Sequence, residues 1–286
     1  MSGDADSPDD APDDDALPPM EEPAPGSPEA ALQERFASAL RALPSLPELP
    51  MRQAWIAQAL EELDPLEAVF WLDQLIRGAL WGHTAHMDAY MAATLWLIER
   101  GLADDYALLQ RLFEAAHEEG REAVKFLLRE APPLRALERG AKLPEARLPM
   151  DRQVTLGERR QIAVSAPRRL MERLLLDPHP MVIARVLQNP GVRPVDVQVI
   201  ASRRPTTPEL LVEVVRHARW FRVHEVRESL AMNPYNHTGV ALRLLPTLHV
   251  KTLRRIRDAG DLHRAVSDFA RLLVELRERR TAPLRV

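Results

Sequence analysis

Two nine-residue stretches decide the fold: VIARVLQNP at residues 182–190 and VRESLAMNP at residues 226–234. The matched positions are Val182 with Val226, Val186 with Leu230, and Asn189-Pro190 with Asn233-Pro234. In each copy the apolar positions are four residues apart and lie on one helical face. The copies are 44 residues apart. A period of this length made of short helices predicts an α-solenoid, in which neighbouring repeats stack and share one core.

The Asn-Pro pairs, Asn189-Pro190 and Asn233-Pro234, are interpreted as the turns that end these helices. Proline excludes the helical conformation from the residue before it, so the helix must stop there. An Asn side chain can bond to nearby backbone groups at such a turn. All four residues are therefore predicted to have a structural role.

The chain on either side continues the pattern. Each Asn-Pro stop is followed by a second apolar helix, near 195–201 and near 240–245, and a less regular copy begins near Leu156. Thr207-Pro208 predicts another helix start, because Thr is a good N-cap and Pro suits the first turn. A last helix, which we expect Asp261 to cap, closes the array.

The runs LLLDPHPMVIARVLQNP (174–190) and ARWFRVHEVRESLAMNP (218–234) resemble HEAT-like and leucine-rich-repeat-variant helical repeats. They are similar in particular to those of a group of bacterial repeat proteins. The resemblance covers about residues 156–280. It implies a binding scaffold made of short paired helices and indicates no particular chemistry.

Residues 28–130 are predicted to form a helical N-terminal domain. The expected helices begin at Pro28, cover 49–63, begin at Pro65, cover 85–100 and 104–118 with Gly101 between them, and end with a shorter helix at 121–130. Ser27 and Asp64 are the candidate N-caps of the first and third helices. The third helix is apolar around much of its circumference, so we expect it to be central.

Two segments lack helical periodicity. Residues 1–27 are acidic and rich in Pro, and are predicted to be disordered because they bury too little apolar surface to fold. This tail solubilises the chain, masks the basic C-terminal face of it, or serves as an interaction tail. Residues 131–155 hold four prolines and are interpreted as a linker, or as a long loop within one domain, with a short helix expected at 133–139. Residues 156–286 are then the repeats with a C-terminal capping helix.

The composition indicates an all-α protein. Of 286 residues only 11 are Gly and 5% are aromatic, while the good helix formers Leu, Ala, Arg and Glu are abundant. The chain has no cysteine, which excludes disulfides and thiolate metal sites. It shows no signal peptide and no apolar run near the ~20 residues of a membrane span. A cytoplasmic location is the expectation.

Charge is distributed unevenly along the chain. Residues 1–30 carry ten acidic and no basic side chains, whereas residues 151–286 carry 25 basic and 14 acidic ones. A basic C-terminal part predicts an acidic or anionic partner. Only three of the 38 basic residues are Lys, and a GC-rich genome produces the same arginine excess without selection for binding.

One cluster combines cations with an aromatic ring and is the candidate partner-binding site. It consists of Arg203, Arg204, Arg216, Arg219, Trp220 and Arg222. Arginine forks bind carboxylate or phosphate groups, and Trp and Arg are frequent at protein interfaces. The alternative is structural: Trp220 packs between repeats while Arg203 and Arg204 flank a turn.

No motif of an enzyme is present, neither a phosphate-binding glycine loop nor a hydrolase or kinase signature. His83-x-x-His86-x-Asp88 is the one metal-like spacing, and we interpret these residues as surface or capping groups. No catalytic residue, metal or cofactor is therefore expected.

The function predicted is that of a non-enzymatic adaptor, which binds an acidic protein or its own tail. Nucleic-acid binding is the alternative, by analogy with HEAT-like DNA glycosylases at the level of fold alone. A purely structural subunit, which would form a homo-oligomer, is the third.

Overall fold

The computed structural model describes residues 27–103, 105–138, 143, 148–150 and 152–281. Within these residues the chain forms helices, turns and loops and no β-strand, as the all-α prediction required. The predicted acidic tail lies outside the described residues except for Ser27, as does much of the predicted linker.

Local capping chemistry sets the first helix starts as predicted. The N-terminal helices are α1 (Pro28–Ala42), η1 (Leu43–Ser45), α2 (Leu49–Glu62), α3 (Pro65–Leu80), α4 (Thr84–Leu102), α5 (Tyr106–Glu118) and α6 (Glu122–Leu127). Ser27 Oγ accepts a hydrogen bond from the Ala30 amide (3.1 Å), and Asp64 accepts from the amides of Leu66 and Glu67. The chain divides into two compact units between Ala39 and Leu40, so that α1 spans the division and the later helices belong to the second unit.

Helix α3 is central to the N-terminal helices, which confirms the prediction from its apolar circumference. Leu72, Leu75 and Ile76 are completely buried, and even Asp73 is enclosed, where it accepts hydrogen bonds from Arg77 and Arg121. The helix packs against α4, α5 and α6.

Two expectations about this part of the chain are wrong. Gly101 does not separate two helices but lies in the last turn of α4, and the described residues 133–138 of the expected helix at 133–139 are not helical. The chain at 132–135 is instead bonded to a distant segment. The Pro132 carbonyl accepts from Thr238 Oγ1 (2.7 Å), and the Arg135 amide donates to the Pro234 carbonyl (2.9 Å).

The C-terminal part forms three helix groups. The first is α7 (Leu156–Ser165), α8 (Arg168–Leu174) and α9 (Pro180–Leu187); the second is α10 (Pro194–Ser202), α11 (Pro208–Arg216), α12 (Ala218–Phe221) and α13 (His224–Ala231); the third is α14 (Thr238–Leu244), η2 (Leu245–Thr247), α15 (Val250–Arg257) and α16 (Arg264–Thr281). Helix α10 begins 38 residues after α7, and α14 begins 44 residues after α10.

Two predicted caps in these groups differ from the structure. Thr207 precedes α11 but its side chain makes no capping hydrogen bond. Asp261 does not cap α16, because its carboxylate is paired with Arg204 (2.7 Å), and His263 Nδ1 accepts from the Ala265 amide in its place (3.2 Å). His179 does the same for α9 by accepting from the Met181 amide.

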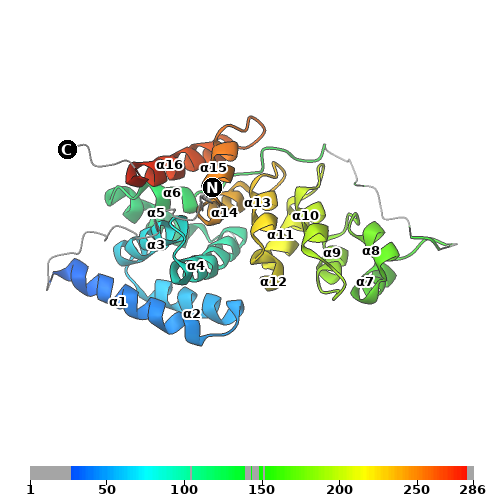
Figure 1. Ribbon diagram of the computed structural model, residues 1–286, viewed down its shortest axis with the longest axis horizontal. Coiled ribbons are helices and arrows are strands. Elements are labelled where there is room, and N and C mark those ends of the chain that lie inside the picture. The colour runs from blue at the N-terminus through cyan, green and yellow to red at the C-terminus, as the bar shows by residue number, and fades with distance from the viewer. Residues whose placement is uncertain (1–26, 104, 139–142, 144–147, 151, 282–286) are drawn as a thin grey trace, which may run out of the picture. The chain divides into compact units, whose positions relative to one another are not determined.

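The third helix group packs against the N-terminal helices: α14 contacts α4 and α6, α16 contacts α6, and η2 contacts α3 (Figure 1). Arg243 of α14 is 1% exposed, forms an ion pair with Glu130 (2.5 Å) and donates to the Leu127 carbonyl (2.9 Å). Two glycines make room for this pair. A Cβ atom at Gly101 or at Gly239 would lie 2.1 or 2.2 Å from a Glu130 carboxylate oxygen.

Further contacts extend this junction. The rings of Phe126 and Phe269 stack with centroids 4.9 Å apart, and Arg277 donates to the Leu80 carbonyl at the end of α3. Helices from before and after the predicted linker therefore share one apolar core. Within the described residues no helix is both long and apolar enough to span a membrane.

Candidate partner-binding surface

The two Asn residues of the Asn-Pro pairs make matching contacts that reach beyond their own turns. Asn189 Nδ2 donates to the carbonyls of Ala163 and Ala166 at the end of α7, and Asn233 Nδ2 donates to those of Ala201 and Arg203 at the end of α10. Each Oδ1 accepts from the amide two residues later, at Gly191 or Tyr235. Each side chain thus joins its turn to the end of an earlier helix, and Pro190 and Pro234 follow directly.

Arg203 and Arg204 follow α10, and both are occupied by bonds within the chain. Arg203 donates to the carbonyls of Leu176 (2.7 Å) and Asp177 (3.2 Å), and burial lowers its pKa from the usual value. Arg204 pairs with Asp261 and also donates to the Met232 carbonyl. These two guanidinium groups join consecutive helix groups.

Arg216 at the end of α11 forms a two-pronged ion pair with Glu99 of α4. Its Nε lies 2.9 Å from Oε1 and its Nη2 lies 3.1 Å from Oε2 of that carboxylate. The bond to Glu99 raises the pKa of Arg216, while burial and the Glu99 charge raise the pKa of Glu213. Arg216 therefore links the second helix group to the N-terminal helices.

Trp220 is 1% exposed and donates from its indole nitrogen to the Leu187 carbonyl at the end of α9 (2.9 Å). Its ring is therefore enclosed between the first two helix groups, which is the packing role that the sequence left as an alternative. Arg219 lies over this ring, 4.2 Å from its centroid, and Arg222 is the residue that ends α12. Both arginines are exposed.

The six residues of the sequence-predicted site thus fall into two sets. Arg203, Arg204 and Arg216 are held by carbonyls or carboxylates of other elements. Arg219 and Arg222 have no carboxylate partner among the residues that the structure describes. Arg219 lies on α12 and Arg222 directly follows it, with Trp220 as the buried anchor between them in sequence. The name α12 edge is used below for Arg219, Trp220 and Arg222.

Helix α12 has no counterpart in the first and third helix groups. The start of α13 follows the start of α11 by 16 residues, whereas α9 follows α8 by 12. The four extra residues fall where α12 stands. In helical repeat proteins an insertion of this kind is accommodated on the surface and frequently contributes to the binding face.

Sequence reasoning missed a second surface, on α10. Val195 and Val199 are 52% and 43% exposed, although the other face of the same helix is buried through Val197 and Ile200. The signal was available, since PVDVQVIAS places apolar residues on both sides of the helix. The equivalent positions in α14, 44 residues on, are Gly239 and Arg243, where α4 and α6 cover the helix.

The metal-like spacing does not gather its three residues. His83 precedes α4, the His86 ring lies against Gly78, and Asp88 pairs with Arg52 (2.6 Å). Burial, together with the nearby His83, lowers the pKa of His86 from 6.5 to about 4. Over the described part of the chain no group of three or more His, Asp or Glu side chains could hold a metal ion.

Comparison with known proteins adds no relative: no family model, no curated protein and no solved structure matches the chain. The likeness to HEAT-like and leucine-rich-repeat-variant repeats therefore remains a prediction from the quoted runs. The case for function depends on the geometry of the described residues.

Proposed function

We propose that this protein is a non-enzymatic scaffold that binds an acidic segment of a protein partner at the α12 edge. The observation that carries the proposal is two exposed arginines at α12, a helix that only the second group contains: Arg219 lies on the helix and Arg222 directly follows it. Guanidinium groups without a carboxylate partner favour binding of carboxylates, which they hold through two parallel hydrogen bonds.

The surroundings of the α12 edge support this choice. Trp220 fixes the short helix by its bond to Leu187, so Arg219 and Arg222 are presented from an anchored backbone. A rigid support lowers the ordering cost that binding otherwise carries. Many other arginines of the helix groups are already paired, among them Arg254 with Glu278 and Arg255 with Glu228.

The test measures binding of a fluorescent peptide with the sequence of residues 1–26, which is rich in Asp and Glu. Fluorescence anisotropy should show saturable binding to a chain of residues 27–286, which keeps the Ser27 cap, and weaker binding to the full chain, whose own tail competes. R219E combined with R222E should weaken binding at least tenfold, because two attractive pairs become repulsive.

The matched control is R254E combined with R255E, which changes the net charge by the same amount at arginines that already have partners. It should leave the affinity within about twofold, since exposed ion pairs on this scale contribute little. Equal loss in both double variants would contradict a localised site and indicate an effect of net charge alone.

Nucleic-acid binding is the second candidate, favoured by the basic balance of residues 151–286. A labelled 20-base-pair duplex is its probe, and the affinity should fall steeply as salt rises from about 50 to 200 mM. The scaffold proposal expects no saturable binding of this duplex at about 150 mM salt.

A further inference from the structure

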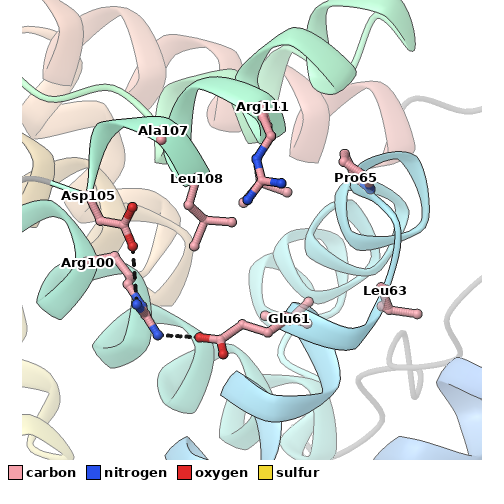
Figure 2. A pocket seen from close by; sticks show the side chains of 10 residues that line it. Glu61, Leu63, Pro65, Arg100, Asp105, Ala107, Leu108 and Arg111 are labelled. Atoms are coloured by element: carbon pink, nitrogen blue, oxygen red, sulfur yellow. Dashed lines mark hydrogen bonds and ion pairs between the residues drawn. The ribbon is translucent and has the colours of Figure 1, made fainter.

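A cavity of about 360 Å³ lies among the N-terminal helices, far along the chain from the α12 edge (Figure 2). It is lined by the end of α2, the start of α3, the end of α4 and the first turns of α5. Leu60 and Leu112 are buried at its base, and Leu63 and Leu108 extend the apolar lining. Its volume falls in the range of sites that hold small molecules.

The two acidic side chains of the lining share one arginine as their ion-pair partner. Arg100 donates to Glu61 on one side and to Asp105 on the other (3.2 Å for Asp105), as the dashed lines in Figure 2 show. Glu61 accepts a second hydrogen bond from the indole nitrogen of Trp96 (3.0 Å). Arg100 thus links the end of α4 with α2 and with the start of α5.

The fourth charged group of the lining is Arg111 of α5, and its guanidinium points into the cavity (Figure 2). In the part of the chain that the structure describes, no carboxylate pairs with it. The lining therefore combines one cation that has no such partner, two carboxylates that Arg100 occupies, and six apolar residues from α2, α3, α5 and the turn before α3.

From this arrangement we infer that the cavity binds a small monocarboxylate joined to an apolar group. The carboxylate binds the Arg111 fork through two hydrogen bonds, and the apolar group contacts Leu63 and Leu108. A cationic ligand is disfavoured because Glu61 and Asp105 would have to give up their ion pairs with Arg100 in order to bind it. A free carboxylic acid and the C-terminus of a peptide that ends in an apolar residue share this chemistry.

The experiment titrates the full chain with N-acetyl-leucine and with a hexapeptide that ends in leucine, each beside its amidated form. Binding is followed by calorimetry and by the chemical shifts of the α5 amides. Both carboxylate probes should saturate below about 5 mM, and each amide should bind at least tenfold more weakly, because it lacks the charge that Arg111 holds. Preference for the peptide over the free acid identifies a peptide terminus as the natural source, and the reverse identifies a metabolite.

Two variants test the role assigned to Arg111. R111Q should lower the affinity for both carboxylate probes at least tenfold. R111K should bind them with an affinity between those of R111Q and the unaltered chain, because an ammonium group keeps the charge but lacks the planar fork. Arg111 is exposed, so both variants should keep the melting temperature and the circular dichroism of the unaltered chain.

The inference is overturned if the amides bind as tightly as the acids, if R111Q leaves the affinity unchanged, or if neither carboxylate saturates. The double variant R219E/R222E should bind these probes normally, and R111Q should bind the acidic peptide of residues 1–26 normally. Failure at the cavity is therefore distinguishable from failure at the α12 edge.

Discussion

Single side chains join the helix groups to one another. Asn189 and Asn233 each donate to two carbonyls at the end of an earlier helix and accept from one amide of their own turn. The sequence predicted that these residues end a helix, because Pro follows each of them. It could not predict the hydrogen bonds to the earlier helix, because the acceptor carbonyls lie 23 to 32 residues earlier in the chain.

Replacement of Asn233 by Ala should lower the free energy of unfolding by about 1–3 kcal/mol, because buried backbone groups lose their partner. The midpoint of urea denaturation measures this, with the slope unchanged. Gln188, the exposed residue before the equivalent Asn189, provides the control, and Q188A should change the free energy of unfolding by less than about 0.5 kcal/mol. An N233A midpoint equal to that of Q188A would contradict the role assigned to Asn233.

At His86 the structure predicts a dependence of stability on pH. Burial and His83 lower the pKa of the folded state to about 4 from 6.5, so the unfolded chain binds a proton between these values while the folded chain does not. Stability should therefore fall as pH falls from 7 to 5, by about 1 kcal/mol after allowance for the exposed part of the ring. Denaturant unfolding of H86Q should show a smaller fall over the same range. An equal fall in H86Q would show that other groups cause it.

At the scale of elements, the local sequence predicted where helices begin, but it did not predict which helices contact one another. Ser27 and Asp64 precede prolines and cap α1 and α3 as expected, because a cap needs only residues within one turn. Gly101 was interpreted as a helix stop, but α4 continues through it to Leu102, and a Cβ atom at this position would lie 2.1 Å from a Glu130 carboxylate oxygen. That contact joins residues about thirty positions apart and leaves no periodic signal in the sequence.

Two equivalent glycines give a matched test of the junction between α14 and the N-terminal helices. Gly239 and Gly157 are each the second residue of their helix, in α14 and α7. G239A places a Cβ atom 2.2 Å from Glu130, so the carboxylate must move away from buried Arg243. We expect a loss of about 1–3 kcal/mol, the cost of overpacking, because the added atom meets the flexible end of a side chain that is 24% exposed.

Gly157 has nothing within 4 Å of the same added atom. G157A should therefore stabilise the protein by about 0.5–1 kcal/mol, the usual preference for Ala within a helix. Thermal and urea denaturation of the two variants provide the comparison. Similar effects of both substitutions would contradict the close approach of Glu130 to α14.

At the scale of the whole molecule, the charge distribution predicted a basic C-terminal part but not which arginines are free. Arg216 meets Glu99 across 117 residues of sequence, and Arg204 meets Asp261 across 57. Such pairs depend on how the helices pack, which no local pattern records. Because Arg203, Arg204 and Arg216 are held by bonds within the chain, the candidate site is reduced from six residues to the three of the α12 edge. Nothing in the sequence indicated the cavity at Arg111.

The central claim is that an acidic partner binds at the α12 edge. Its most direct test is hydrogen exchange of the chain of residues 27–286 with and without a saturating concentration of the peptide of residues 1–26. The account predicts slower exchange concentrated in residues 217–223, which contain α12, and no slowing there in R219E/R222E. Slower exchange spread over α15 and α16, or none at residues 217–223, would contradict it.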